Sequence, residues 1–298
     1  MSIRARIVRA IVATVMRKFD AETADISLLR RLEKVVSRFA ITAFGVRVLA
    51  DEIGGLHAEW LTPKKRIDGK LLLYMHGGGY VVGGCDMHRQ MVSHIARAGK
   101  IQALLPEYRL APEHKFPAAI EDCLTIYKSL LQSGIKSADI IFAGDSAGGG
   151  LVMATLLALR DTHEPMPAAA VLLSPFLDVT GSGKSMQTRA ECDPIFNAKD
   201  VGLIADFYCE PHQVLFPQVS PVFADVEGLP AMLIQVGNDE ILLSDAERIT
   251  EQCVAAGIDV SLEVWPEMWH VFQIFVGKMP ESGRAIEKIG SFIQSRFA

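Results

Sequence analysis

The stretch DIIFAGDSAGGGLVMATLLALR, residues 139–160, decides the fold because it joins a strand to a helix through a turn of small residues. Its first part, Asp139–Ala143, is a short, largely apolar run typical of a buried strand, and Gly149–Arg160 has the pattern of a helix. The residues between them, Gly144–Gly148, match G-x-S-x-G with Ser146 at the centre. Such a turn lifts a serine hydroxyl out of the sheet, and only small neighbours fit beside it. The stretch therefore predicts a strand–turn–helix unit that presents Ser146 as a nucleophile, with a solvent-facing serine as the alternative.

Short apolar runs alternate with helical patterns on both sides of this unit. The runs are His57–Leu61, Lys70–Met75, Ile101–Leu105, Asp139–Ala143, Ala168–Leu173, Ala231–Val236 and Asp259–Val264. The helical patterns lie near Met87–Ala98, Pro117–Gln132, Ala147–Arg160, Asp245–Ala256 and Glu281–Arg296. Strands that alternate with helices predict βαβ units, so the expected fold class is α/β, with a mostly parallel central sheet flanked by helices.

Two regions depart from this alternation. Residues 1–45 have helical, polar-rimmed patterns, and residues 176–218 contain glycines, prolines and a helical patch near Lys199–Tyr208 that do not form one crossover helix. We expect N-terminal cap helices in 1–45 and a catalytic domain in 46–298. The insertion at about 176–218 would complete a helical cap over the carboxyl edge of the sheet. An insertion with a purely structural purpose is the alternative.

The composition is that of a globular protein, since half of the 298 residues are hydrophobic and 22% are charged. The 30 basic and 35 acidic residues give a net charge of −5, so nothing suggests nucleic acid as the main partner. No apolar run approaches the roughly 18 residues of a membrane-spanning helix. Five widely spaced cysteines without a CxxC pair argue against a disulfide framework or a zinc ribbon and favour the cytoplasm. The spacing of His88 and His94 does not suggest a metal site either.

The segment Met1–Phe19 is basic and apolar, which superficially resembles a signal peptide. Arg9 interrupts its apolar stretch, and no small-residue cleavage site follows before Arg17 and Lys18. We therefore expect an amphipathic helix that stays on the protein and packs as a lid or against a second subunit of a homodimer. A role at a membrane surface is also open.

Three consecutive glycines follow the predicted strand Lys70–Met75, in the segment His76–Gly79. Consecutive glycines are costly to order, which makes sense where backbone N–H groups must approach a ligand closely. Acyl transfer needs such donors for its tetrahedral oxyanion, and the loss of one costs about 10²–10³ in rate. The glycines therefore predict an oxyanion loop near Ser146, with a flexible surface turn as the alternative.

A serine nucleophile needs a base and an orienting acid, which follow it in the chain order serine, acid, histidine in this arrangement. Of the three downstream histidines, His163 and His212 lie in a polar turn and in the insertion, whereas His270 follows the last predicted strand. His270 is therefore the predicted base. Asp239 follows another predicted strand and is preferred as the acid over its neighbour Glu240.

The assembled motifs resemble those of the hormone-sensitive-lipase-like branch of α/β-hydrolases, the bacterial family IV esterases. The matching stretches are HGGGY (76–80), PEYRLAPEHKFPAAIED (106–122), AGDSAGGG (143–150), VGNDEIL (236–242) and WPEMWHVF (265–272). The resemblance extends from about His57 to the C-terminus. It implies an enzyme that hydrolyses short- to medium-chain acyl esters through an acyl-enzyme intermediate, without a cofactor or metal.

The resemblance also implies roles for individual residues. Ser146 would be the nucleophile, His270 the base and Asp239 the acid. The oxyanion would be held by the backbone N–H groups of Gly78, Gly79 and Ala147. Residues that shape or brace the loops around the site would be His76, Gly77, His88, Arg89, Tyr108, Arg109 and Glu113.

Five aromatic residues are candidates for lining an acyl or alcohol pocket, although each could belong to the core instead: Phe176, Tyr208, Phe216, Trp269 and Phe272. The same triad would serve an amide, lactone or carbamate hydrolase, because the leaving group and the pocket decide the substrate. A non-catalytic small-molecule receptor on this fold is a further alternative, and it would typically lack a triad member. The third alternative is a membrane-associated lipid hydrolase that uses the basic N-terminal helix.

Overall fold

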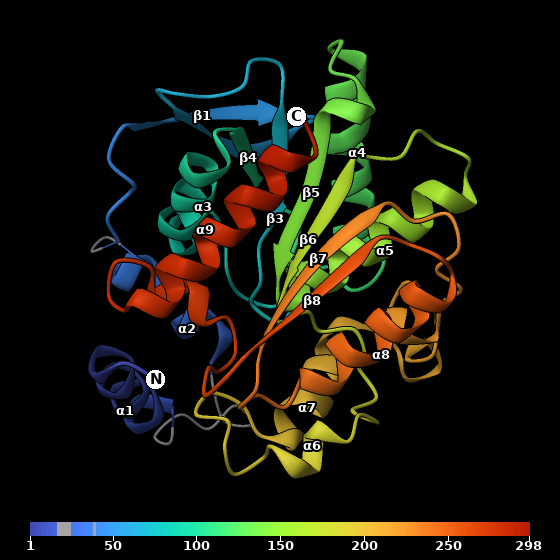
Figure 1. Ribbon diagram of the computed structural model, residues 1–298. Helices are drawn as coiled ribbons and strands as arrows, with labels where there is room; N and C mark the ends of the chain where they lie inside the picture. Colours follow the sequence, from blue (N-terminus) through green and yellow to red (C-terminus); the bar gives the residue numbers. More distant parts are fainter. Residues whose placement is uncertain (17–24, 38–39) are drawn as a thin grey trace.

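The computed structural model describes residues 1–16, 25–37 and 40–298 (Figure 1). Its centre is an eight-stranded sheet with the order β1-β2-β4-β3-β5-β6-β7-β8. The strands are β1 (Val46–Ile53), β2 (Leu56–Pro63), β3 (Leu71–Met75), β4 (Gln102–Pro106), β5 (Ile140–Asp145), β6 (Ala169–Leu173), β7 (Ala231–Gly237) and β8 (Val260–Trp265). Neighbouring strands from β4 to β8 pair parallel, whereas β2 pairs antiparallel with both β1 and β4. The predicted α/β class with a mostly parallel sheet is confirmed.

All seven predicted strands are present, and β1 is a strand that the sequence analysis does not predict. It pairs along its whole length with β2 across Gly54 and Gly55, whose φ angles of 61° and 82° suit a two-residue hairpin turn. None of the side chains of β1 is buried. The strand therefore lacks the apolar run from which the other strands are predictable, and its turn glycines are the signal that could have found it.

Helices cover both faces of the sheet. They are α1 (Ile3–Met16), α2 (Ile26–Ser37), α3 (Cys85–Gly99), α4 (Ala118–Gln132), α5 (Ala147–Asp161), α6 (Ser185–Thr188), α7 (Ala198–Tyr208), α8 (Leu243–Ala255) and α9 (Pro280–Ser295). One face carries α3 and α9, and the other carries α4, α5 and α8 (Figure 1). The five predicted helices of the sheet domain correspond to these five, with ends that differ by at most two residues.

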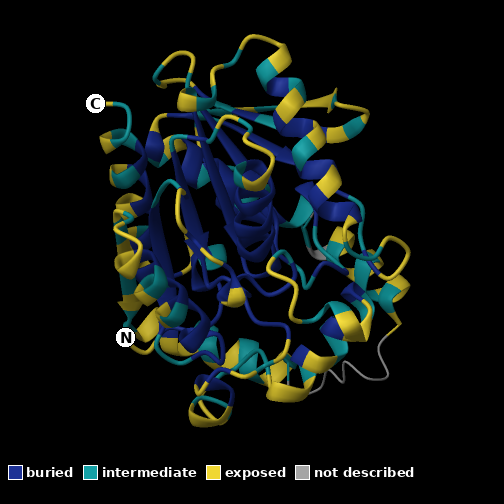
Figure 2. Ribbon diagram, turned by 90° about the vertical axis from the view of Figure 1, so that its right-hand side faces the viewer, coloured by how far each residue is buried: buried dark blue, intermediate teal, exposed yellow. Residues whose placement is uncertain are grey.

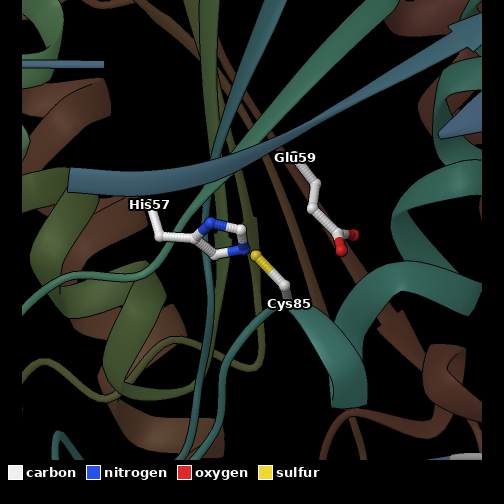
Figure 3. A group of neighbouring side chains, drawn as sticks. All are labelled: His57, Glu59 and Cys85. Carbon is white, nitrogen blue, oxygen red and sulfur yellow. The ribbon is translucent and has the colours of Figure 1, made fainter. Parts of the chain in front are cut away.

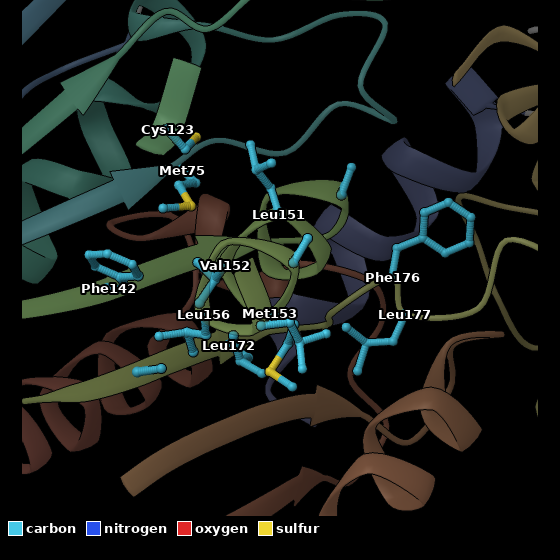
Figure 4. Close-up of a cluster of buried hydrophobic side chains, with 14 of the residues drawn as sticks. Met75, Cys123, Phe142, Leu151, Val152, Met153, Leu156, Leu172, Phe176 and Leu177 are labelled. Atoms are coloured by element: carbon cyan, nitrogen blue, oxygen red, sulfur yellow. The ribbon is translucent and has the colours of Figure 1, made fainter. Parts of the chain in front are cut away.

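The helix α5 lies at the centre of the larger core, and each of its residues from Ala147 to Leu159 is buried. Figure 4 shows its side chains, including Leu151 and Leu156, beside Phe142 of β5. Truncation of such a leucine to alanine typically costs about 2–5 kcal/mol. Because this helix begins directly after Ser146, the serine is fixed to a buried helix of the core.

The carboxyl ends of five strands meet at one edge of the sheet. The residues that follow them include His76 after β3, Ser146 after β5, Ser174 after β6, Glu240 after β7 and His270 after β8. The ends of parallel strands are where α/β proteins assemble their sites. The topology thus brings five polar side chains to one region from segments far apart in the chain.

The helices α1 and α2 and the insertion with α6 and α7 lie at this carboxyl end (Figure 1). The predicted helical patch in the insertion corresponds to α7. The predicted N-terminal helix is observed as α1, which ends at Met16, and residues 17–19 lie outside the described residues. Figure 2 shows the buried residues concentrated in the sheet and the exposed ones on the surrounding helices and loops. Within residues 1–16, 25–37 and 40–298, no helix is both long and apolar enough to cross a membrane.

Candidate active site

Ser146 occupies the sharp turn between β5 and α5. Its backbone has φ 52° and ψ −123°, outside the usual regions for a residue with a side chain, and it is 7% exposed. Two hydrogen bonds fix the turn, since its N–H donates to the carbonyl of Leu173 at 2.9 Å and its carbonyl accepts from the N–H of Phe176 at 2.9 Å. A Cβ on Gly144 would lie 2.4 Å from the carbonyl oxygen of Gly148. The small neighbours of the motif are therefore required by contact distances, as the sequence predicted.

The glycine loop after β3 is packed against this turn. A Cβ on Gly77 would lie 2.3 Å from the carboxylate of Asp145, and a Cβ on Gly78 would lie 2.1 Å from the carbonyl oxygen of Val82. Gly78 and Gly79 have φ angles of 118° and 61°, which favour glycine. At Gly77 and Gly78 a larger residue could not follow this path without displacing backbone.

Three backbone N–H groups at this turn have no hydrogen-bond acceptor within the part of the chain that the structure describes, namely those of Gly78, Gly79 and Ala147. Ala147 is the first residue of α5, so its N–H also lies at the positive end of the helix dipole. Unpaired donors at a helix start favour the binding of a negatively charged oxygen.

A buried ion pair supports the glycine loop from behind. The carboxylate of Asp145 accepts hydrogen bonds from Tyr74 Oη at 2.8 Å and from the N–H of Gly77 at 3.1 Å, and lies 3.3 Å from Nε2 of His88. Burial opposes the charge on both ionisable partners. Their mutual attraction nevertheless lowers the pKa of Asp145 and raises the pKa of His88. His88 thus orders the loop.

The aromatic ring of Tyr108 supports the same loop. It stacks on the His76 ring at a centroid distance of 4.1 Å, and its hydroxyl donates to the His76 carbonyl at 2.7 Å. Burial, with a smaller contribution from the charge of His88, lowers the pKa of His76 to about 3, so this histidine stays neutral. It braces the loop and does not exchange protons near neutral pH.

The acid that the structure brings to His270 is Glu240. Its Oε1 lies 3.5 Å from His270 Nδ1, and its Oε2 accepts from Ser174 Oγ and from the N–H of Gly237, both at 2.9 Å. Ser174 Oγ in turn accepts from the N–H of Val271 at 3.0 Å. Glu240 is completely buried, and Ser174 ties its carboxylate to the loop that carries the histidine.

Asp239, the acid preferred on sequence, points elsewhere. Its carboxylate accepts a hydrogen bond from Arg9 of α1 at 2.6 Å and remains partly exposed. The same guanidinium donates to the carbonyls of Cys192 at 2.6 Å and Glu267 at 3.2 Å. The two acidic neighbours thus have different partners: Glu240 faces His270, whereas Asp239 anchors α1. Adjacent residues in a turn point in different directions. The position of the pair after β7 therefore does not indicate which of the two carboxylates faces His270.

The charges around His270 favour its protonated form. Burial alone would lower the pKa of His270. The hydrogen bond to Glu240 and the charges of Glu240, Asp193 and Asp145 outweigh burial and raise this pKa above its usual value of 6.5. A carboxylate that raises the basicity of an imidazole is the arrangement expected beside a general base.

A pocket opens beside Ser146. The residues that line it are Gly79, Ser146, Phe176, Phe196, Val201, Ile204, Ile241 and Leu242. Phe196 also contacts His270, edge to face, with ring centroids 4.9 Å apart. Ser146 therefore borders an apolar space, and one residue of its wall, Phe196, contacts His270.

Of the five aromatic pocket candidates, Phe176 lines this pocket, and the other four are not among its lining residues. Tyr208 is buried and stacks on Tyr80 at a centroid distance of 3.7 Å, while Phe216 is 43% exposed at the surface. Trp269 and Phe272 are buried in a separate core cluster that includes Ala5 of α1. Tyr208, Trp269 and Phe272 thus contribute to packing, whereas Phe216 lies at the surface.

Most of the pocket wall comes from residues that the sequence analysis did not single out. Phe196, Val201 and Ile204 belong to the insertion, and Ile241 and Leu242 follow Glu240. Val201 and Ile204 are three residues apart on α7, which places them on one helix face. That apolar face lies on a helix expected over the site, so it is the sequence feature from which these pocket residues could have been predicted.

One group of possible metal ligands consists of His57, Glu59 and Cys85, whose ligand atoms lie within 4.8 Å of one another (Figure 3). Arg89 already donates to both carboxylate oxygens of Glu59, at 2.7 and 2.6 Å. The Cys85 thiol donates to the carbonyl of Leu105, and burial raises its pKa. The carboxylate and the thiol thus have structural partners, which a metal ion would have to displace.

Left-handed backbone conformations gather around the candidate site. Tyr80, Ser146, Ser174, Glu267 and Val271 have φ angles between 45° and 62° without being glycine. For Val271 this is unusual, because its side chain is branched at Cβ. Such conformations cost about 1–3 kcal/mol each and persist only where surrounding contacts impose them.

Comparisons with known proteins agree with this architecture. A family model described as an alpha/beta hydrolase fold matches residues 72–274. An acetyl-hydrolase of Streptomyces hygroscopicus is 40% identical over 243 residues, which are 82% of this chain and 81% of that protein. The crystal structure of an esterase from the bacterial hormone-sensitive lipase family has a TM-score of 0.95 and 40% identity, covering 100% of this chain and 99% of that one. The structure of EstE5 soaked with p-nitrophenyl butyrate has a TM-score of 0.93 and 37% identity, with the same coverage. The chain is a carboxylic ester hydrolase and belongs to the α/β-hydrolase family, in the branch of esterases similar to hormone-sensitive lipase.

Proposed function

We propose that Ser146, His270 and Glu240 form the catalytic triad of this serine carboxylesterase. The observation that carries the proposal is the buried Glu240 carboxylate, 3.5 Å from His270 Nδ1 and held by Ser174 Oγ and the N–H of Gly237. A carboxylate held in this way accepts the Nδ1 proton of a neutral imidazole and leaves Nε2 free to act as a base. Asp239 has Arg9 as its partner instead, so we assign it to the anchoring of α1.

The proposed reaction proceeds in two stages. His270 accepts the hydroxyl proton of Ser146 as Oγ attacks the ester carbonyl, and then donates this proton to the alcohol that leaves. In the second stage His270 accepts a proton from water, which attacks the acyl-enzyme and releases the acid and the free serine. Glu240 stabilises the imidazolium that forms in each stage.

The oxyanion of both tetrahedral intermediates would bind the N–H groups of Gly78, Gly79 and Ala147. Their unpaired state within the described residues supports this assignment. Because the glycine loop and the start of α5 are fixed by close contacts, these donors need little rearrangement when charge develops.

The expected substrates are esters of short- to medium-chain acids. The pocket beside Ser146 is lined by aliphatic and aromatic side chains, including Val201 and Ile204 of α7. Such a wall accepts an acyl chain and limits its length. The soak of the similar EstE5 with p-nitrophenyl butyrate makes this ester a suitable first substrate.

The helices at the carboxyl edge would act as the cap. We assign this role to residues 1–45 and 176–218, because α7 contributes to the pocket wall and Arg9 of α1 contacts the Asp239 and Glu267 segments. All five cysteines are free thiols, which supports a place in the reducing cytoplasm.

The test is hydrolysis of p-nitrophenyl esters of increasing acyl length by the wild type and by Ser146→Ala. We expect the highest kcat/KM at short acyl chains, and a loss of up to about 10⁶-fold in kcat for the variant. A folded Ser146→Ala variant that retains turnover would assign the nucleophile elsewhere. Turnover of amides or lactones but not of esters by the wild type would reject the proposed substrate class and leave the triad intact.

A further inference from the structure

The helix α1 exposes the side chains that a packed helix normally buries. Ile3, Ile7, Ile11 and Val15 repeat every four residues along α1, and each is more than half exposed, with values from 55% to 76%. The buried residue of this helix is Ala5. A stripe of four exposed aliphatic side chains on one helix marks an interaction surface more often than an ordinary solvent face.

The neighbouring helix α2 has the same character. Leu28, Leu32 and Val35 are each about half exposed, with values from 50% to 52%, and their spacing places them on one face. Figure 1 shows α1 and α2 at the same end of the molecule, beside the carboxyl edge of the sheet. Two apolar stripes therefore border the region of the candidate site.

Basic residues flank both stripes. Arg4 and Arg6 of α1 are exposed, and so are Arg31 and Lys34 of α2. The acidic residue of α2, Glu33, is partly buried, and its carboxylate accepts a hydrogen bond from the N–H of Gly83. The two helices together carry six basic residues and one acidic residue, a net charge of 6 − 1 = +5, in a chain whose total is −5. The positive charge is thus concentrated on the two helices that expose aliphatic side chains.

The polar sides of both helices are already engaged by the protein. Arg9 of α1 binds Asp239, and Arg30 of α2 donates to the carbonyl of Val81 at 2.9 Å and to the carboxylate of Glu113 at 2.8 Å. These contacts fix the helices so that their aliphatic and basic side chains face outward.

We propose that the outward faces of α1 and α2 dock on an anionic lipid surface. Aliphatic side chains flanked by arginine and lysine are the pattern by which a helix lies in the interface of a negatively charged membrane. A second copy of the chain fits less well, because a symmetric contact would place two faces with the same excess of positive charge against each other. Docking here would hold the site close to the membrane surface.

The test is sedimentation with sucrose-loaded vesicles of phosphatidylcholine with 30% phosphatidylglycerol, compared with phosphatidylcholine alone. We expect binding to the anionic vesicles that falls as salt is added. Each positive charge near the surface contributes about fivefold to the partition coefficient, so Arg4→Glu with Arg6→Glu should lower it at least about 25-fold. The matched control is Lys64→Glu with Lys65→Glu, which makes the same charge change at two exposed lysines of the segment after β2.

A second pair of variants tests the aliphatic stripe. Ile11→Glu should lower the partition coefficient at least about tenfold, whereas Val254→Glu, at a 64% exposed position of α8, should have a much smaller effect. Hydrolysis of soluble p-nitrophenyl acetate reports that each variant is folded. Two binding results would overturn the proposal: equal binding to both kinds of vesicle, or equal losses of binding in a variant and its control. A third contrary result would be a protein that binds no vesicles but forms a concentration-dependent dimer in sedimentation velocity, if Ile11→Glu abolishes that dimer.

Discussion

Replacing Glu240 by glutamine exchanges one oxygen of a buried, hydrogen-bonded carboxylate for an NH₂ group. The oxygen of the new amide would keep the place of Oε2, where it accepts from Ser174 Oγ and the N–H of Gly237, because both donors would otherwise be buried without a partner. The amide nitrogen then faces Nδ1 of His270, 3.5 Å away. Since an amide NH₂ group only donates, Nδ1 must lose its proton, and the proton of the neutral ring moves to Nε2.

An imidazole protonated at Nε2 cannot accept the proton of Ser146. Exchange of a carboxylate for an amide at this place of a serine triad lowers kcat by about 10⁴ because it imposes the wrong tautomer. We expect Glu240→Gln to lose about 10³–10⁴ in kcat with little change in KM. The matched control is Asp239→Asn, one residue away, which weakens a partly exposed ion pair to Arg9 and should cost less than tenfold.

The assay is the pH dependence of kcat/KM on p-nitrophenyl butyrate between pH 5 and 9. In the wild type the activity should fall as the pH drops through the pKa of His270, which its carboxylate neighbours raise above 6.5. Removal of the Glu240 charge should move this limb of the profile to lower pH, whereas Asp239→Asn should leave it in place. A loss of 10³ or more in Asp239→Asn, together with a nearly active Glu240→Gln, would refute the assignment and restore Asp239 as the acid.

Three further perturbations follow from the contacts described above. Gly78→Ala should lose about 10²–10³ in kcat, because the new Cβ would lie 2.1 Å from the Val82 carbonyl oxygen and displace the oxyanion loop, and the measurement is p-nitrophenyl acetate kinetics beside a circular dichroism spectrum. Ile204→Ala should raise the kcat/KM of the hexanoate ester relative to the acetate ester by about tenfold, and an unchanged ratio would remove this residue from the acyl pocket. His88→Ala should destabilise the fold by about 3–5 kcal/mol in urea unfolding, since it leaves Asp145 buried without its ion pair. The pKa of His88 is raised in the folded state, so its contribution is complete below pH 6.5, and the difference between wild type and variant should shrink as the pH rises above that value.

Most of the fold was predictable because most of its strands and helices have a clear hydrophobic pattern in the sequence. The strands β3, β5 and β6 are buried along their whole length and therefore appear as uninterrupted apolar runs. The hairpin strand β1 has no buried residue and depends on pairing with β2, so no periodicity predicts it. Its presence follows from the two turn glycines and from a partner strand.

The site was predictable where the backbone path allows only certain residue types. It was less predictable where a role depends on the direction in which a side chain points. The glycine loop and the turn at Ser146 leave room for only small residues, so their motifs are visible in the sequence. The choice between Asp239 and Glu240 depends on which of two adjacent side chains turns inward, and that is fixed by Ser174 and Arg9 from distant parts of the chain. The pocket wall depends on how α7 lies over the sheet, which is likewise a long-range property.

The left-handed residues around the site have a consequence for attempts to make this enzyme more heat-resistant. Val271 and Ser174 hold unfavourable φ angles of 46° and 45°, and the hydrogen bond between them helps to position the loop that carries His270. A selection for thermal resistance alone would favour substitutions that relax this backbone while keeping the buried contacts, because each relaxed position can recover about 1–3 kcal/mol. Variants gained in that way would survive heating and turn over substrate poorly, so a library for industrial stabilisation should leave these positions unchanged and target sites distant from the carboxyl edge of the sheet.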